Sequence, residues 1–302
     1  MVDPESVLAR SADGPDIVLR YADHEDGIAD VWLAPAVADD APAPLLYALH
    51  GGFWKQQYDR RHLRPLAYAL ANLGWMVVVP EYARVGGSRA DGAAGGAWPL
   101  LTADLRAVRQ RVPELLGEVL PGRVGAERLV VVGHSAGGQL ALWWALDSDA
   151  ADCPRSVLAL APVADLARAQ AEKLGGGAVR ALFAGAPPTA VPPTAVPPNA
   201  VPPNDADPAA RLRAGEAPDC ALVVVHGELD QEIPAAHSAA LGADVAAVDV
   251  RLLPDVEHYG LIDPLSSAWP SVRAALPSLQ HPTTPTPQAP AAPGFLRRRL
   301  GG

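Results

Sequence analysis

Three residues of this 302-residue chain have the types and the order that nucleophilic catalysis requires: Ser135, Asp230 and His258. A serine hydroxyl is a weak nucleophile until a base removes its proton, and a carboxylate usually holds that base, a histidine, in the correct tautomer. Ser135 lies in the stretch Gly133-His134-Ser135-Ala136-Gly137-Gly138, between the apolar runs 129–132 and 139–146. This strand, turn and helix pattern, with glycines around the serine, predicts a tight turn that presents the hydroxyl.

The carboxylate and the histidine are expected after later strands, in that order along the chain. Asp230 lies just past the apolar run 221–225. Its rivals are Glu228, which comes too soon after that run, and Glu232, which adjoins the Ile-Pro leading into a helix. Asp230 is therefore the preferred carboxylate, and a turn or helix-capping role is its structural alternative.

His258 follows the last apolar run, 248–253, in a predicted loop. The competing histidines after Ser135 have less suitable positions. His226 belongs to a strand end, His237 lies within a helical stretch, and His281 is in the tail. Only His258 has the position that the base requires.

The framework that must position these residues is an alternation of buried β-branched runs with segments of helical periodicity. This alternation predicts a mostly parallel central sheet covered by helices on both faces. Two shorter runs at 16–21 and 28–33 predict an antiparallel hairpin before it. We expect strands at 45–49, 75–80, 128–132, 156–162, 221–225 and 248–253, and helices at 64–73, 98–120, 139–146, 235–241 and 262–279.

A second requirement is a set of backbone N–H groups that stabilise the oxyanion of a tetrahedral intermediate. Ala136 is the residue after the serine and begins the predicted helix, so its N–H is one expected donor. The others should come from the loop after the first buried parallel strand, which reads His50-Gly51-Gly52-Phe53-Trp54. We expect His50 to brace this loop rather than to act as a base.

Four segments together resemble the α/β-hydrolase group that contains hormone-sensitive-lipase-like esterases and kynurenine formamidases. They are HGGFW at 50–54, GHSAGG at 133–138, HGELDQEIP at 226–234 and the EHYG around His258. The resemblance implies the α/β-hydrolase fold and implies that Gly52 and Phe53 donate the loop N–H groups. The lipase-like branch usually has a third glycine where this chain has Phe53. The resemblance also makes Trp54, Tyr82 and Trp98 candidates to line a substrate pocket, with core packing as the equal alternative.

These residues predict a serine hydrolase that cleaves a small carboxylic ester or amide through an acyl-enzyme. The alternatives are an N-formylkynurenine or aryl formamidase, and a prolyl-oligopeptidase-like peptidase. A non-catalytic ligand receptor on the same fold is the alternative of another class, because fold alone does not determine function. No cofactor is implied, and no Cys/His cluster has metal-ligand spacing.

Composition limits the classes of partner and the cellular compartment that we expect for this protein. The net charge of −10 argues against a nucleic-acid partner, which leaves a small-molecule substrate. The two isolated cysteines, Cys153 and Cys220, fit a reducing compartment. The acidic start lacks a signal-peptide pattern, and no apolar run is long enough to span a membrane. We therefore expect a cytoplasmic protein with no membrane association, and the sequence indicates no oligomeric state.

Three segments fall outside the pattern of one hydrolase domain, which we expect at 15–280. Residues 1–14 are polar and predicted to be flexible. Residues 187–206 are a pentapeptide repeat with paired prolines, which excludes helix and sheet interior and predicts an extended or disordered surface insertion. A ligand for a proline-binding module, in a scaffold protein, is the alternative reading of this repeat. The Pro-rich tail 281–302 is predicted to be disordered.

Overall fold

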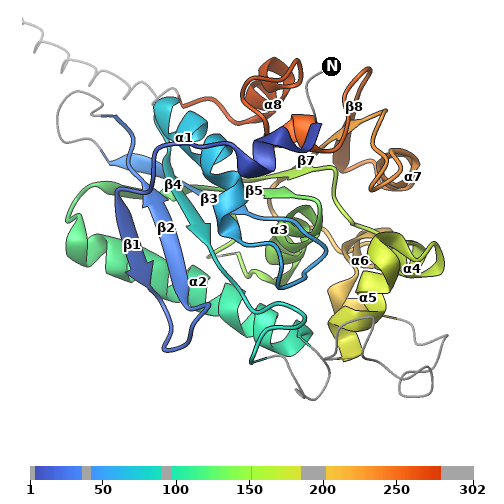
Figure 1. Ribbon diagram of the computed structural model, residues 1–302, viewed down its shortest axis with the longest axis horizontal. Helices are drawn as coiled ribbons and strands as arrows, with labels where there is room; N and C mark the ends of the chain where they lie inside the picture. The colour runs from blue at the N-terminus through green and yellow to red at the C-terminus, as the bar shows by residue number, and fades with distance from the viewer. Residues whose placement is uncertain (1–3, 36–41, 90–96, 151, 185–201, 280–302) are drawn as a thin grey trace, which may run out of the picture.

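The computed structural model describes residues 4–35, 42–89, 97–150, 152–184 and 202–279. Their central feature is one eight-stranded sheet with the order β1-β2-β4-β3-β5-β6-β7-β8 (Figure 1). The first two strands pair antiparallel, β2 pairs antiparallel with β4, and every other pairing is parallel. The strands are β1 (Ile17–Arg20), β2 (Ile28–Trp32), β3 (Ala43–Leu49), β4 (Met76–Pro80), β5 (Val124–His134), β6 (Ser156–Leu160), β7 (Ala221–Gly227) and β8 (Val248–Leu253).

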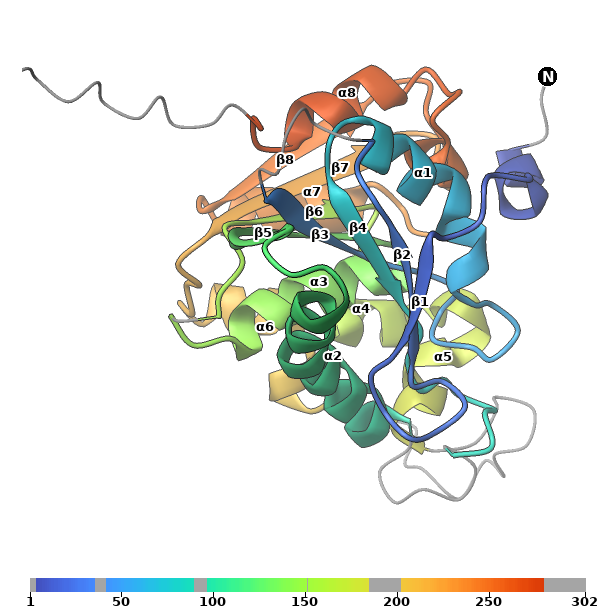
Figure 2. The ribbon, with the colours of Figure 1, turned by 90° about the vertical axis from the view of Figure 1, so that its left-hand side faces the viewer.

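Helices cover both faces of this sheet, as the edge-on view in Figure 2 shows. Two of them, α1 and α8, lie on one face, and α2 and α3 lie on the other. The mostly parallel sheet, the two helical layers and the N-terminal hairpin confirm the predicted fold class. The helices are α1 (Arg64–Asn72), α2 (Trp98–Val119), α3 (Ala136–Asp147), α4 (Leu166–Ala171), α5 (Leu174–Ala184), α6 (Pro208–Arg213), α7 (Ala236–Asp244) and α8 (Trp269–Ala275).

Alternating side chains of the strands pack into two separate hydrophobic cores, one on each face of the sheet. Along β3, Tyr47 and Leu49 pack toward α2 and α3, whereas Leu46 and Ala48 pack toward α1 and α8. Because successive strand residues point to opposite faces, a strand buried on both sides must be apolar throughout. This is why the parallel strands are continuous apolar runs in the sequence.

The helices after β6 and the last helix differ from the sequence expectations. The segment between β6 and β7 contains three helices, α4, α5 and α6, for which the sequence pattern gives no bounds. The helix predicted at 262–279 spans only 269–275. Pro264 disfavours helical backbone at the residue before it, so η4 (Tyr259–Ile262) and α8 are separate elements.

The first described residues pack against the domain, whereas the flexibility expected for residues 1–14 stays a prediction. A 3₁₀ helix, η1 (Pro4–Ala9), buries Val7 completely against the core that contains α1 and α8. Arg10 donates hydrogen bonds to both carboxylate oxygens of Asp263, which joins this segment to the loop after η4. Apolar anchoring by Val7 and a paired charge at Arg10 explain why residues 4–10 belong to the domain.

The end of the proline repeat also belongs to the domain. Residues 187–201 lie outside the described part of the chain. The last unit, 202–206, is not the extended insertion that the sequence predicts, because Asn204–Ala206 form a 3₁₀ helix, η3. Ala206 is fully buried, and its carbonyl accepts a hydrogen bond of 2.9 Å from Gln139 Nε2 of α3.

Candidate active site

Ser135 occupies a strained turn between β5 and α3. Its backbone angles are φ 57° and ψ −118°, which a residue with a side chain rarely adopts and which cost on the order of 1–3 kcal/mol. The flanking glycines make the turn possible. A Cβ on Gly133 would lie 2.0 Å from the carbonyl oxygen of Gly137, and one on Gly137 would lie 2.1 Å from that of Leu49. The chain therefore holds the Ser135 side chain at the carboxyl end of β5 by close backbone packing.

Gly137→Ala is expected to destabilise the protein by about 3 kcal/mol or more, because backbone atoms on β3 leave no room for a methyl group. Urea unfolding of the variant measures the effect. Gly117→Ala is a matched control on α2, where a Cβ meets no atom within 4 Å. That change should raise the free energy of unfolding by about 0.5–1 kcal/mol, through helix propensity. A Gly137 variant as stable as the wild type would contradict the packing argument.

Asp230 and His258 meet beside Ser135 at the same edge of the sheet. Asp230 follows β7 and His258 follows β8, and His258 Nδ1 lies 2.6 Å from Asp230 Oδ2. Ser135 and His258, which are 2% and 4% exposed, both line a cavity of about 90 Å³. No hydrogen bond joins the Ser135 hydroxyl to His258 within the described residues. Such contacts are often long in unliganded enzymes and tighten when substrate binds.

The Asp230 carboxylate is held ionised by four hydrogen bonds. Oδ1 accepts from the backbone N–H groups of Glu232 and Ile233, each at 2.8 Å, and Oδ2 accepts from His258 and His226. Burial alone would raise the pKa of Asp230, but hydrogen bonds from the two histidines outweigh it and hold the pKa below its usual value. An ionised carboxylate only accepts, so His258 Nδ1 carries its proton and leaves Nε2 free to act as a base.

His226 is a neighbour of Asp230 that the sequence did not reveal. It is fully buried at the end of β7, and its Nε2–H donates to Asp230 Oδ2 at 3.1 Å and to the carbonyl of Ile233 at 2.9 Å. Its Nδ1 accepts from Ser238 Oγ at 2.7 Å. The interpretation of His226 as a strand-end residue rather than the base agrees with this position, but its bond to Asp230 depends on the turn that follows the strand.

The rival candidates for the carboxylate and for the base do not form a comparable pair beside Ser135. Glu228 is exposed, and exposed Glu232 contributes only a backbone N–H to Asp230 while lying at the cavity wall. His237 pairs with Glu172 at 2.8 Å, away from the cavity. His281 lies outside the described residues. Of the candidate bases after Ser135 that the structure describes, only His258 both lines the cavity of Ser135 and contacts the Asp230 carboxylate there.

Three backbone N–H groups around Ser135 have no acceptor within the described part of the protein: those of Gly52, Phe53 and Ala136. Gly52 and Phe53 line the cavity with Ser135, and Ala136 is the first residue of α3. The first N–H groups of a helix lack intrahelical acceptors and lie at the positive end of its dipole. The arrangement offers donors to a negatively charged oxygen beside the serine.

As the sequence predicts, His50 supports the loop that carries Gly52 and Phe53, through contacts with Glu81 and Tyr82. His50 Nε2 lies 2.7 Å from Glu81 Oε1, and the imidazole stacks on the Tyr82 ring with 4.2 Å between centroids. The Tyr82 hydroxyl donates to the carbonyl of His50 at 2.5 Å. Glu81 Oε2 also accepts from the backbone N–H of Arg60. These buried bonds fix the backbone that presents the loop N–H groups.

Glu81→Gln is expected to lower the free energy of unfolding by roughly 3 kcal/mol near neutral pH. Burial by itself raises the pKa of Glu81, but the charge and hydrogen bond of His50, with Arg84 and the Arg60 N–H, outweigh it and lower the pKa from 4.5 to about 2. Because the folded pKa is depressed, this stabilisation is complete above pH 4.5 and is lost as the pH falls toward 2.

Urea unfolding at neutral pH and near about pH 3 tests this expectation, with the exposed Glu114→Gln as control. The difference between wild type and the Glu81 variant should shrink on acidification. A difference that is independent of pH would show that the charge of Glu81 does not contribute.

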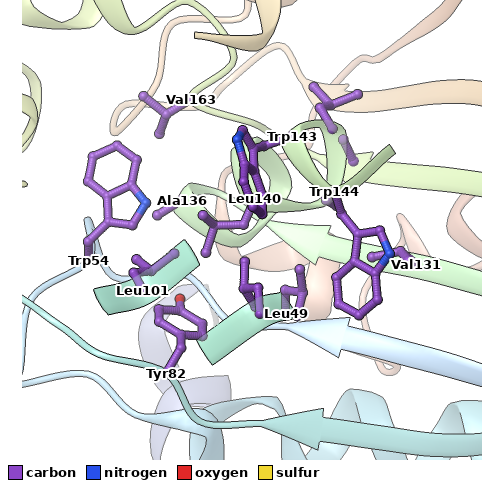
Figure 3. Close-up of a cluster of buried hydrophobic side chains, with 14 of the residues drawn as sticks. Leu49, Trp54, Tyr82, Leu101, Val131, Ala136, Leu140, Trp143, Trp144 and Val163 are labelled. Carbon is purple, nitrogen blue, oxygen red and sulfur yellow. The ribbon is translucent and has the colours of Figure 1, made fainter. Parts of the chain in front are cut away.

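The three aromatic residues proposed for the substrate pocket lie in the core. Trp54 and Tyr82 are completely buried in the cluster that Figure 3 shows, and Trp54 Nε1 donates to Gln139 Oε1 at 3.2 Å. Trp98 packs edge-on against Trp143 with 5.5 Å between centroids. None of the three lines the cavity of Ser135, so a role in contacting substrate stays a prediction. The residues that do line it, besides those already named, are Leu8, Tyr58, His62, His134 and Tyr259.

The described residues contain no cluster of three histidine, cysteine or acidic side chains arranged to hold a metal ion. None of the helices they form is both long and apolar enough to cross a membrane. Both cysteines, Cys153 and Cys220, are free and partly buried.

Comparison with known proteins is consistent with this architecture. The sequence profile of the prolyl oligopeptidase family matches residues 121–262, which include Ser135, Asp230 and His258. The search of curated proteins found no match.

Solved structures of esterases share the fold at low identity. Esterase B from Lactobacillus rhamnosis is 19% identical over 90% of this chain and 86% of its own, with a TM-score of 0.61. A propionate-bound esterase from the planctomycete Thermogutta terrifontis is 16% identical over 81% of this chain and 85% of its own, with a TM-score of 0.56. A carbohydrate esterase from gut microbiota is 13% identical over 85% of this chain and 95% of its own, with a TM-score of 0.63. The sheet order, the two helical layers and these likenesses show that the chain has the α/β-hydrolase fold.

Proposed function

We propose that this protein is a serine hydrolase that cleaves small carboxylic esters through an acyl-enzyme. The observation that carries the proposal is the 2.6 Å contact of His258 Nδ1 with Asp230 Oδ2, at a cavity that His258 shares with Ser135. A nucleophile, a base and an orienting carboxylate then occupy the three roles that acyl transfer needs.

In the proposed reaction, His258 Nε2 takes the proton of the Ser135 hydroxyl as Oγ attacks the carbonyl carbon. Asp230 keeps the proton on His258 Nδ1 and stabilises the imidazolium that forms. The N–H groups of Gly52, Phe53 and Ala136 bind the oxyanion, and each such donor contributes about 3 kcal/mol. His258 then protonates the leaving group as its bond to the carbonyl carbon breaks. In the second half, His258 takes a proton from the water that attacks the acyl-serine and returns it to Ser135 Oγ as the carboxylic acid leaves.

The preference for esters is supported by the esterase neighbours, among them the Thermogutta terrifontis esterase, which was solved both with bound propionate and after phosphonylation by sarin. A cavity of about 90 Å³ beside Ser135 suits a short acyl group. The experiment is turnover of 4-nitrophenyl acetate by the purified full chain, beside N-formylkynurenine and a 4-nitroanilide of a blocked Gly-Pro dipeptide. Hydrolysis of the ester alone is the expected result.

Peptidase activity is the second candidate, because the matching sequence profile is that of the prolyl oligopeptidase family. Turnover of the Gly-Pro anilide above the ester would favour it. Dominant turnover of N-formylkynurenine would instead favour the formamidase. Absence of turnover on all three substrates, with a folded protein, would favour a ligand receptor on a hydrolase fold.

A further inference from the structure

A second and larger cavity adjoins the one that contains Ser135. It has a volume of about 370 Å³ and lies between the N-terminal segment 8–12 and residues 57–64. Both cavities are lined by Leu8, Tyr58 and His62, so the two share a wall. A substrate bound at Ser135 that extends past these three residues would enter the larger cavity.

The lining of the larger cavity is positively charged in a protein of net charge −10. It includes three arginines, Arg10, Arg61 and Arg64, and one carboxylate, Asp59. Burial lowers the pKa of the lining histidine, His62, to about 3, so that its imidazole is neutral. The lining side chains thus include two more positive than negative groups, and two carboxylates outside the lining, Asp263 and Asp30, pair with Arg10 and Arg64.

The three arginines differ in how many of their hydrogen-bond donors are already paired within the protein. Arg10 is bound to both oxygens of Asp263 and fixes the N-terminal segment. Arg61 is 64% exposed and lies 3.6 Å from Asp59, beyond hydrogen-bond distance. The Asp59 carboxylate also accepts the backbone N–H of Arg61 as the cap of η2 (Arg60–Leu63).

Arg64 also has few acceptors for its guanidinium N–H groups. Its one close acceptor within the described residues is Asp30 Oδ2, at 3.5 Å. Asp30 is shared with Arg60, whose Nε lies 2.9 Å from Oδ1. The Nε of Arg64 is buried and has no partner among the described residues. The side chains of Arg61 and Arg64 are 64% and 32% exposed, so both retain donors that a bound anion can use.

We propose that this cavity is a subsite for a carboxylate carried by the substrate, bound by Arg61 and Arg64. The proposal rests on the proposed function and narrows it to esters that bear a negative charge away from the scissile bond. A planar guanidinium offers paired N–H donors that match the two oxygens of a carboxylate, which a neutral ester group cannot replace.

The test compares 4-acetoxybenzoate with its methyl ester, and the mono-4-nitrophenyl ester of succinic acid with 4-nitrophenyl butyrate. The two pairs place the charge on the leaving group or on the acyl group. The full-length wild type should favour the anionic member of at least one pair in kcat/KM. In Arg61→Gln/Arg64→Gln this preference should fall about tenfold. Added salt should weaken it in the wild type.

Two further variants keep the test independent of folding. Arg61→Gln changes an exposed side chain and should lower the preference by itself. Arg111→Gln, an exposed residue on α2, removes the same charge elsewhere and should leave the preference intact. No anionic preference in the wild type, or a preference retained in the double variant, would overturn the subsite.

A binding measurement separates failure of the subsite from failure of the hydrolase. In calorimetry, Ser135→Ala should bind the anionic member of the pair that the wild type prefers more tightly than its neutral partner, and the double arginine change should remove the difference. Such binding without any turnover by the wild type would support the subsite and contradict the catalytic proposal. Turnover of neutral esters with no such binding difference would overturn the subsite alone.

Discussion

Ser135→Ala is expected to lower kcat for 4-nitrophenyl acetate by about 10⁵–10⁶-fold with little change in KM, because the acyl-enzyme no longer forms. Alanine lacks only the hydroxyl, so the backbone at φ 57° is strained no more than it is in the wild type. The neighbouring glycines and the side chains of Asp230 and His258 are unchanged. The fold and the free energy of unfolding should therefore stay close to those of the wild type.

Steady-state kinetics measures this loss, and circular dichroism confirms the fold. Ser271→Ala, on α8, is the matched control and should keep wild-type turnover. Residual activity of the Ser135 variant within tenfold of the wild type would assign the nucleophile to another group.

Asp230→Asn is expected to lower kcat by about 10⁴-fold. Oδ2 accepts from two histidines at once, His258 at 2.6 Å and His226 at 3.1 Å. An amide nitrogen in that position can only donate, so His258 would have to accept through Nδ1 and would carry its proton on Nε2. In that tautomer the imidazole cannot take the proton of Ser135.

The control for this change is Glu228→Gln, which neutralises an exposed carboxylate on the same turn. It should leave turnover unchanged. An Asp230 variant with nearly full activity would mean that Asp230 is only a structural partner of His226 and that another group orients the base.

The meeting of Ser135, Asp230 and His258 at one edge could be predicted because the chain order and the sheet type fix it. Each residue follows an apolar run, and the carboxyl ends of parallel strands lie at one edge of the sheet. The turn at Ser135 could be predicted because glycines surround the serine in the sequence. The structure shows why they are needed, since the close packing of Gly137 against the Leu49 carbonyl admits no side chain. These features depend on local pattern and on rules that hold for every parallel sheet.

The walls of the site could not be predicted because they depend on contacts between distant segments. Leu8 lines the cavity of Ser135 from a segment that is held by the burial of Val7 and by the pairing of Arg10 with Asp263, which is distant in the sequence. The bond of His226 to Asp230 requires the turn after β7 to fold back. Trp54, predicted as either pocket or core, is enclosed by α3 through its bond to Gln139. No periodicity in the sequence records such contacts.

The most direct test of the central claim is labelling of the full-length protein with a fluorophosphonate, followed by mass spectrometry of its peptides. Our account predicts one adduct per chain, on the peptide that contains Ser135, and no adduct in Ser135→Ala. His258→Ala should label far more slowly, since the base is missing. A folded wild-type protein that takes no label, or takes it on a different serine, would contradict the assignment of Ser135 as the nucleophile.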